Sequence, residues 1–267
     1  NVQIFEQCWL PETPRAALLI VHGLKDHGSR YAELAEALVA RGVATCAIDL
    51  PGHGKSEGER VFPGSFDEYV EDVRMAIARM QLRFAGKPVF LFGHSMGGAI
   101  TTLYTIRDQP QLAGLVLSGA ALATDAPEGQ LKLLRKVARK WPHARVLKLK
   151  ARKFSRDKAV LRAAKDDPLV DHRKIPARVA LGIVDAIDEI TANDAKLVVP
   201  LLVLHGAADE ITPPEGSKAL VVGAGSQDKT FTSLPGLYHD LVHEPERAKV
   251  IATIADWVDA RIAKPAG

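Results

Sequence analysis

Short runs of consecutive apolar residues alternate along the chain with segments in which apolar residues recur every three or four positions. Such runs are typical of strands buried on both faces, and the wider spacing is typical of amphipathic helices. The expected strands cover 18–21, 43–48, 89–92, 115–117, 201–204 and 230–234, and the expected helices cover 31–40, 66–84, 99–106 and 250–262. This order predicts an α/β fold, with a mostly parallel, doubly wound sheet covered by helices on both faces.

The alternation stops between residues 121 and 194, where no strand pattern is visible. Two helices are expected there, one with its apolar face at Leu131, Leu134, Val137 and Trp141 and the other at Val179, Ile183 and Ile187. We therefore expect a core made of residues 1–120 and 195–267, with a helical cap inserted at 121–194. Ligands bind outside the carboxyl ends of the strands in such sheets, so a cap that leaves the sheet there would cover the active-site crevice.

Charge is distributed unevenly. The chain carries +3, but residues 130–158 contain 12 Lys and Arg and a single acid, which leaves the rest of the chain at −8. This segment lacks interleaved aromatic residues for base stacking, so we do not expect nucleic-acid binding. Between Leu131 and Trp141 basic residues alternate with apolar ones. The helix is therefore expected either to lie on an anionic membrane surface or to cover the pocket with its charges in solvent.

Two segments match the Gly-x-Ser-x-Gly pattern, centred on Ser56 and on Ser95. A serine nucleophile in this pattern lies on a tight turn between a strand and a helix, with its hydroxyl exposed. Ser56 lies in a loop rich in glycine, whereas Ser95 follows the strand expected at 89–92 and leads into a helix. Ser95 is therefore the candidate nucleophile.

A serine hydroxyl needs a base to remove its proton and an acid to orient that base, in the chain order Ser, acid, His. His239 follows the last expected strand on a turn and is the candidate base, with His243 as its rival. Asp209 follows the strand at 201–204 and is the candidate acid, with Glu210 as the alternative. Together with Ser95, Asp209 and His239 form a candidate catalytic triad.

The oxyanion formed during attack needs backbone N–H donors. One is expected from Met96, directly after the nucleophile at a helix N-terminus, and the other from Leu24, after the first expected strand. Gly23 would let the backbone approach the substrate closely. The side chains of Leu24 and Met96 are not themselves expected to take part in the chemistry.

Several motifs in this order resemble those of the monoacylglycerol lipase and lysophospholipase-like serine hydrolases, a family with the α/β-hydrolase fold. The resemblance spans nearly the whole chain. It rests on His22-Gly23 with His27-Gly28-x-Arg30-Tyr31, on Asp49 to Gly58, on Gly93 to Gly98, on His205-Gly206-x-x-Asp209 and on Tyr238-His239. The cap is the least similar part, and the cap sets substrate choice in such enzymes.

The resemblance implies a cofactor-free esterase that acts on single-chain lipid esters, with monoacylglycerol cleaved to glycerol and fatty acid through an acyl-enzyme on Ser95. Lysophospholipids or general short-chain esters are the alternative substrates. It also implies an acyl pocket beneath the cap, and we expect Gly23, Ile183 and Ile187 to contact the substrate. An iminopeptidase would need cap acids to hold a substrate amine, and Asp185, Asp188 and Glu189 leave that open. A noncatalytic binding protein would normally have lost part of the triad.

No metal site is expected, because no His and Glu spacing matches a known ligand pattern. No membrane-spanning helix or signal peptide is expected either. The two cysteines, Cys8 and Cys46, are too few for a disulfide framework and are expected to be small core residues in a reducing compartment. The expected location is cytoplasmic, with a possible peripheral contact to a membrane through the basic cap.

Overall fold

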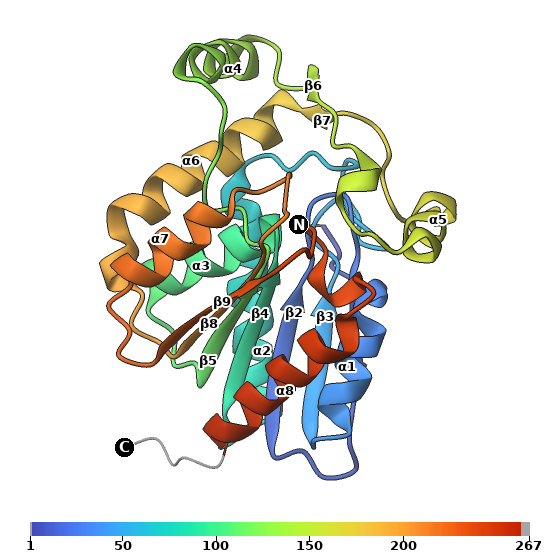
Figure 1. Ribbon diagram of the computed structural model, residues 1–267, viewed down its shortest axis with the longest axis vertical. Coiled ribbons are helices and arrows are strands. Elements are labelled where there is room, and N and C mark those ends of the chain that lie inside the picture. The colour runs from blue at the N-terminus through green and yellow to red at the C-terminus, as the bar shows by residue number, and fades with distance from the viewer. Residues whose placement is uncertain (1, 263–267) are drawn as a thin grey trace.

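The computed structural model describes residues 2–262, which fold around a seven-stranded sheet (Figure 1). The strands lie in the order β1-β3-β2-β4-β5-β8-β9, and all neighbouring pairs are parallel except β1 with β3. The strands are β1 (Glu6–Trp9), β2 (Ala16–Val21), β3 (Val43–Ile48), β4 (Val89–His94), β5 (Gly114–Ser118), β8 (Leu201–Gly206) and β9 (Lys229–Leu234). The predicted α/β class with a mostly parallel sheet is confirmed.

Helices cover both faces of this sheet. The helices packed around it are α1 (Ala32–Val39), α2 (Phe66–Arg83), α3 (Met96–Asp108), α7 (Pro214–Gly223) and α8 (Arg247–Ile262). Successive residues of a strand point to opposite faces, so Leu18 and Ile20 contact the layer of α1 and α8, while Leu19 and Val21 contact the layer of α2 and α3. Burial on both sides explains why the strands read as continuous apolar runs.

The edge strand β1 overturns the expectation for the cysteines. It runs antiparallel to β3 and places Cys8 directly opposite Cys46, with their Cα atoms 4.0 Å apart. The two residues form a disulfide, which is one bridge rather than a framework. The prediction of two free core cysteines is therefore wrong, and the reducing compartment inferred from it loses its support. The prediction failed because no strand was expected at β1, so the pairing of Cys8 with Cys46 could not be anticipated.

Residues 121–194 lie above the carboxyl ends of the central strands (Figure 1). Their elements are α4 (Glu128–Lys140), β6 (Arg145–Leu147), the 3-10 helix η2 (Ala151–Lys153), α5 (Lys158–Asp166), β7 (Ile175–Pro176) and α6 (Ala177–Asn193). The two expected helices correspond to α4 and α6. The expectation of no strand is wrong, since β6 and β7 form a short antiparallel pair. These strands have three and two residues, too few for an alternating pattern.

The remaining short 3-10 helices are η1 (Gly28–Tyr31), η3 (Asp194–Lys196) and η4 (Leu241–His243). Two of them position polar residues beside the carboxyl ends of the strands, η1 after β2 and η4 after β9. Within residues 2–262 no helix is both long enough and apolar enough to cross a membrane.

Candidate active site

Ser95 occupies the turn between β4 and α3. Its backbone has φ 52° and ψ −120°, a conformation that residues other than glycine rarely adopt. The flanking glycines allow the turn to close: a Cβ on Gly93 would lie 2.3 Å from Oγ1 of Thr101, and one on Gly97 would lie 2.3 Å from the carbonyl oxygen of Val21. The sharp turn follows from these glycines, and Ser95 lines a pocket as the strand–turn–helix pattern predicts.

The structure brings Ser95, His239 and Asp209 into one hydrogen-bonded chain. The Ser95 hydroxyl donates to Nε2 of His239 over 2.8 Å, and Nδ1–H of His239 donates to Oδ2 of Asp209 over 2.7 Å. The side chains of His239 and Asp209 are fully shielded from solvent. Each residue follows a different strand, β4, β8 or β9, so the parallel sheet delivers all three to one edge.

Asp209 is held by more donors than His239 alone. Its Oδ1 accepts hydrogen bonds from the amides of Ile211 and Thr212 at 2.7 and 3.1 Å. Its Oδ2 also accepts from the Thr212 hydroxyl at 2.9 Å and from Nε2 of His205 at 3.1 Å. Burial by itself raises the pKa of Asp209, but the His239 ring and these hydrogen bonds outweigh it and hold the pKa well below its ordinary value. The acid is therefore ionised throughout the neutral range.

The other serine in a Gly-x-Ser-x-Gly segment is part of the framework. The Ser56 hydroxyl accepts from the Phe5 amide at 2.8 Å and donates to the carbonyl oxygen of Asp49. It thereby ties the N-terminal segment to the loop after β3, and within residues 2–262 no histidine ring forms a hydrogen bond with this hydroxyl.

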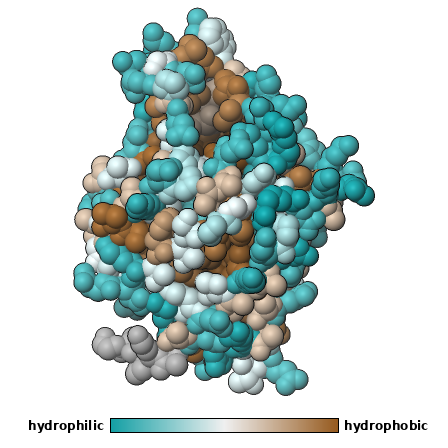
Figure 2. Space-filling view, viewed as in Figure 1, coloured by the Kyte–Doolittle hydropathy of each residue, from teal (hydrophilic) through white to brown (hydrophobic). Residues whose placement is uncertain are grey.

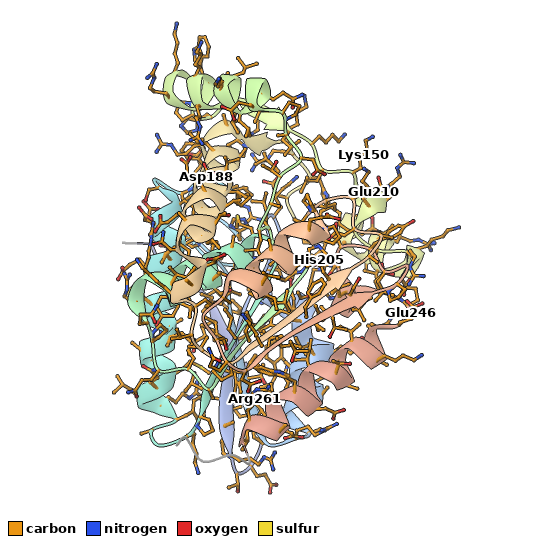
Figure 3. All side chains as sticks on the ribbon, turned by 60° about the vertical axis from the view of Figure 1, so that its left-hand side comes forward. Lys150, Asp188, His205, Glu210, Glu246 and Arg261 are labelled. Atoms are coloured by element: carbon orange, nitrogen blue, oxygen red, sulfur yellow. A yellow bond between two sulfur atoms is a disulfide. The ribbon has the colours of Figure 1, made fainter. Side chains whose placement is uncertain are left out.

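The rival base and the rival acid are also engaged elsewhere. His243 contacts Oδ1 of Asp240 through Nδ1 at 2.7 Å and the carbonyl oxygen of Arg30 through Nε2 at 2.8 Å. Glu210 forms an ion pair with Lys153. Figure 3 shows Glu210 near Lys150 on the cap side of the molecule, whereas His205, which does contact Asp209, lies in the interior.

The two expected oxyanion donors flank the serine turn. Met96 is the first residue of α3, and Leu24 follows Gly23 in the loop after β2. A Cβ on Gly23 would lie 3.0 Å from Cδ2 of His94 and 3.2 Å from Cβ of Ser95, so this loop runs directly against the nucleophile. Among residues 2–262 neither amide has a hydrogen-bond acceptor, which leaves both N–H groups available to a substrate oxygen.

A cavity of about 840 Å³ opens beside Ser95. Its floor comes from the core and includes Gly23, Leu24 and His94, and its walls come from the segment 148–172. The apolar part of that wall consists of Leu149, Ala151, Phe154, Val160, Leu161, Ala164 and Val170. The cavity therefore places the candidate nucleophile Ser95 beside an apolar surface, an arrangement that suits a lipid ester.

Of the three residues expected to contact substrate, the structure places only Gly23 in this cavity. Ile183 and Ile187 lie on α6 but do not line the cavity among the described residues; Ile183 packs against the hydrophobic core, and Ile187 is buried. Neither residue belongs to the described wall of this cavity, and their contact with substrate stays a prediction. The wall is built from α5 and the segment before it, because α6 uses its apolar face to pack against α3 and α4.

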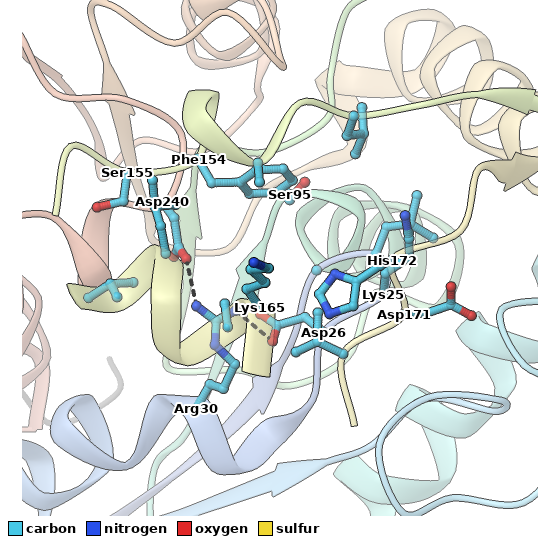
Figure 4. A pocket seen from close by; sticks show the side chains of 18 of the residues that line it. Lys25, Asp26, Arg30, Ser95, Phe154, Ser155, Lys165, Asp171, His172 and Asp240 are labelled. Atoms are coloured by element: carbon cyan, nitrogen blue, oxygen red, sulfur yellow. Dashed lines mark hydrogen bonds and ion pairs between the residues drawn. The ribbon is translucent and has the colours of Figure 1, made fainter. Parts of the chain in front are cut away.

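A buried group of charges that the sequence analysis did not identify lies next to the triad (Figure 4). Arg30 donates to Oδ1 of Asp26 at 2.8 Å and to Oδ2 of Asp240 at 3.2 Å. Burial disfavours both carboxylates, but His243 and Arg30 hold the pKa of Asp240 below its ordinary value, and Arg30 does the same for Asp26. Two features of the sequence could have revealed this group of charges. Asp240 directly follows His239, and Arg30 belongs to the Arg30-Tyr31 motif.

A metal site does not emerge from the described residues. The one cluster of potential ligand atoms found within residues 2–262 consists of Glu6, Cys8 and Cys46. Its two sulfur atoms form the disulfide, so neither is a thiolate that could bind a metal ion.

Comparisons with known proteins agree with this geometry. The family model described as serine aminopeptidase, S33, matches residues 12–246. The monoacylglycerol lipase of Mycolicibacterium smegmatis is 36% identical over 261 residues, covering 97% of this chain and 93% of that protein. The monoglyceride lipase of Homo sapiens is 35% identical over 266 residues, with coverage of 97% and 88%.

A solved structure shows the same similarity. The crystal structure of Paleococcus ferrophilus monoacylglycerol lipase matches with a TM-score of 0.88 and 30% identity, covering 97% of this chain and 99% of that one. This chain is therefore a member of the S33 family of serine hydrolases with the α/β-hydrolase fold, the family to which these monoacylglycerol lipases belong.

Proposed function

We propose that this enzyme hydrolyses carboxylic esters of single-chain lipids, with monoacylglycerol among its substrates. The observation that carries the proposal is the hydrogen-bonded chain from Ser95 through His239 to Asp209 at the edge of a cavity with an apolar wall. The printed names of the relatives in Mycolicibacterium smegmatis and Homo sapiens support the same substrate class.

The geometry supports a two-step mechanism. His239 takes the proton of Ser95 as the hydroxyl attacks the ester carbonyl, and the amides of Leu24 and Met96 receive the oxyanion. His239 then gives that proton to the departing glycerol oxygen, which leaves an acyl-enzyme. A water molecule activated by the same histidine releases the fatty acid and restores Ser95. Asp209 keeps Nδ1 of His239 protonated and stabilises the imidazolium.

We further propose that residues 121–194 act as a cap on a core formed by residues 1–120 and 195–267. The support is that the cavity beside Ser95 has a core floor and a wall from the segment 148–172. The apolar residues of α5 and of the preceding segment would then receive the acyl chain. Residue 1 and residues 263–267 lie outside the described part of this core.

We also propose that the basic cap contacts anionic lipid surfaces. Figure 2 shows hydrophobic surface at the top of the molecule, beside hydrophilic residues of α4. Leu133 and Trp141 are 60% and 57% exposed there, and Val146 and Leu147 are also exposed. The polar side of α4 carries Lys132, Lys136, Arg139 and Lys140, all exposed. Apolar side chains beside several cations are the combination that lets a helix bind at a membrane interface.

Vesicle binding tests this contact. Sedimentation with phosphatidylcholine vesicles should increase when anionic phosphatidylglycerol is added and should decrease as salt rises. Lys136→Gln with Lys140→Gln should weaken that binding, whereas Arg83→Gln with Lys87→Gln, which removes the same charge at the opposite end of the sheet, should not. Binding that ignores both lipid charge and salt would contradict the proposal.

A peptidase activity, which the description of the family model raises, is not favoured by the cavity. An aminopeptidase needs a free carboxylate to hold the substrate amine. The acids that line the cavity, Asp26, Asp171 and Asp240, each have an arginine partner among the described residues. The cap acids Asp185 and Asp188 pair with Arg135 outside the cavity, and Glu189 pairs with Arg107.

The deciding experiment compares release of fatty acid from monooleoylglycerol, from oleoyl lysophosphatidylcholine and from a butyrate ester. Ser95→Ala should abolish all three activities, whereas Ser56→Ala, the same change in the other Gly-x-Ser-x-Gly segment, should retain turnover. Activity on neither lipid, with the butyrate ester still cleaved, would reduce the enzyme to a general esterase. Turnover that survives in Ser95→Ala would overturn the assigned nucleophile.

A further inference from the structure

Cationic side chains from the cap surround the cavity beside Ser95. Among the described residues that line it, four exposed cations come from the segment 148–165, namely Lys148, Lys150, Arg162 and Lys165. Two more, Lys25 and Arg30, come from the core. Figure 4 shows Lys165 projecting into the same cavity as Arg30 and Ser95. A neutral ester such as monoacylglycerol needs no such concentration of positive charge.

The acids of the cavity do not neutralise these four cations. Asp26 and Asp240 are bound to Arg30, and Asp171 is bound to Arg173. Within residues 2–262 none of the four cap cations forms an ion pair with a carboxylate. Glu210 lies near Lys150, but it is already paired with Lys153.

Some arginines elsewhere on the surface are paired with carboxylates. Arg107, Arg135 and Arg156 each bind two carboxylates. Other cations, such as Arg139, Arg152 and Lys158, also have no ion pair within residues 2–262, so the cavity group is distinguished by its position around Ser95. A group of unmatched cations beside a nucleophile is what an anionic ligand would complete.

The arrangement of the cations concentrates their charge. Arg162 and Lys165 lie three residues apart on α5, so they share a helix face, where like charges repel each other. Lys25, which also lines the cavity, has charged neighbours of both signs. Burial lowers the pKa of Lys25, and the cations Arg145, Arg173 and Lys148 lower it further, against the opposing effect of Asp171.

We propose that the cavity selects single-chain lipid esters whose head group carries a phosphate with net negative charge, held by Lys148, Lys150, Arg162 and Lys165. This inference rests on the proposed ester hydrolysis at Ser95 and specifies its substrate class. A phosphate offers several oxygens to ammonium groups and can accept two parallel hydrogen bonds from a guanidinium. The apolar side chains of the same wall, Leu161 and Phe154 among them, would contact the acyl chain.

The chemistry at Ser95 does not change with this substrate. The bond between the acyl carbon and the glycerol oxygen breaks, and glycerol phosphate leaves with the proton that His239 took from Ser95. Water then hydrolyses the acyl-enzyme to free fatty acid. The phosphate is not transferred in either step. Its role is to place the ester carbonyl over Ser95 and to increase the rate of encounter.

The test measures kcat/KM for three oleoyl esters in the same micelles of neutral detergent. These are 1-oleoylglycerol 3-phosphate, which is anionic, 1-oleoyl lysophosphatidylcholine, which is zwitterionic, and 1-oleoylglycerol, which is neutral. We expect the anionic ester to have the highest kcat/KM and its advantage over the neutral ester to shrink as sodium chloride rises. A neutral ester that is cleaved as fast as the anionic one would overturn the inference.

Charge-removing variants locate the selectivity. Arg162→Gln with Lys165→Gln should lower the ratio of anionic to neutral kcat/KM roughly fivefold to tenfold, the effect expected for two partly exposed ionic contacts. Lys148→Gln with Lys150→Gln should lower it in the same direction. Arg152→Gln with Lys158→Gln is the matched control, because it removes the same charge from the same segment at residues that do not line the cavity. An equal change in all three variants would refute recognition inside the cavity.

A further arm separates the head group from the micelle surface. Neutral 1-oleoylglycerol is assayed in micelles doped with hexadecyl phosphate, which supplies the same charge without a carboxylic ester. The enzyme in this arm carries Lys136→Gln with Lys140→Gln, which removes α4 cations proposed to bind anionic surfaces, and we expect less than a twofold change. An increase as large as that seen with the anionic ester would assign the effect to surface attraction and overturn the inference. If Ser95→Ala still cleaves every ester, the proposed function itself fails. If wild-type enzyme cleaves only the neutral ester, only this inference fails.

Discussion

His239 connects two groups with opposite needs. In the proposed mechanism, Ser95 needs a base with a free lone pair on Nε2, and that lone pair exists only while Nδ1 carries the proton. Asp209 fixes this tautomer because it is an ionised acceptor 2.7 Å from Nδ1. The amides of Ile211 and Thr212 hold its other oxygen, so the carboxylate cannot rotate away from the ring. The orientation of the base is therefore decided by the loop after β8.

Substitution of the acid tests this view. Asp209→Asn should lower kcat by about 10⁴-fold, because an amide in place of the carboxylate favours the wrong tautomer of His239. We expect the variant to keep its fold by far-UV circular dichroism. Glu210→Gln is the matched control at the neighbouring position, and its kcat should stay close to wild type, since Glu210 pairs with Lys153. Near-normal turnover in Asp209→Asn would reject the assigned acid.

Arg30 gives a second prediction for a single residue. It is the shared partner of Asp26 and Asp240, so Arg30→Met leaves two buried carboxylates without it. We expect a loss of roughly 3–5 kcal/mol in the free energy of unfolding at pH 8, measured by urea denaturation. Arg41→Met, which removes an exposed arginine with two carboxylate partners, should barely move the urea midpoint.

The pH dependence of the Arg30 effect has a definite sign. Both carboxylates have a lowered pKa in the folded protein, so their ionisation favours folding above the unfolded value of about 4 and ceases to do so as pH falls through the folded values. The loss in free energy of unfolding caused by Arg30→Met should therefore be largest near neutral pH and should shrink as pH falls below about 4. A loss in free energy of unfolding that does not depend on pH would instead indicate lost packing.

The residues of the candidate triad could be predicted because each signal is local. Ser95, Asp209 and His239 each stand a few positions after an apolar strand, and the topology of a parallel sheet then brings them together. The sequence did not indicate that Ile183 and Ile187 lie outside the cavity wall, because a helical spacing shows that a face is apolar but not what that face contacts. Asp26 and Asp240 were missed because their partner Arg30 is distant from Asp240 in the sequence.

At the level of elements, α2 contains a feature that opposes folding. Asp72 lies on its largely buried side, one turn from Glu68 and next to Glu71. Burial and then these two acids raise the pKa of Asp72 to about 6. The folded protein thus binds a proton more tightly than the unfolded chain, and ionisation of Asp72 costs stability as pH rises through 6.

Removal of this charge should stabilise the helix. Asp72→Asn is expected to raise the free energy of unfolding by about 1 kcal/mol at pH 8, a value reduced from the full shift to allow for solvent screening. The gain should disappear near pH 4, where wild-type Asp72 is also protonated in the folded state. Urea denaturation at both pH values checks this. Equal stabilisation at pH 8 and pH 4 would show that ionisation is not the cause.

The elements that could be predicted are those buried on both faces. β2, β4 and β8 are continuous apolar runs, since α1 and α8 pack on one side and α2 and α3 on the other. β1 contains Glu6 and Gln7 and lies at the edge, so it gives no such run. Its strand character depends on pairing with β3, which is distant in the chain and therefore invisible to local pattern analysis.

Across the whole molecule, charge is distributed unequally between the segment 130–158 and the rest of the chain. The segment 130–158 carries 12 cations, some on the outer face of α4 and some on the wall of the cavity. Carboxylates of the loops after β2 and β9, by contrast, are buried around Arg30. Positive charge thus surrounds the entrance while the charges near the triad are internally balanced, which favours the approach of anionic lipids or anionic surfaces.

The disulfide between Cys8 and Cys46 affects the molecule as a whole. It joins positions 38 residues apart and fastens the edge strand β1 to β3, two strands away from β4 and Ser95. By restricting the unfolded chain, a loop of this length is expected to stabilise the fold by about 4 kcal/mol. We therefore expect a reductant to lower the melting temperature by several degrees while kcat at 25 °C is retained.

The double variant Cys8→Ala with Cys46→Ala provides the control. It should melt close to the reduced wild-type protein and should be insensitive to reductant, because no bridge remains to be broken. Titration of thiols in denatured, unreduced wild-type protein should find none. Two free thiols, together with a melting temperature that reductant does not change, would contradict the bridge and return the cysteines to the role of packed core residues. If the wild type is bridged but the double variant is equally stable, the stabilising effect would come from the pairing of β1 with β3 rather than from the bridge.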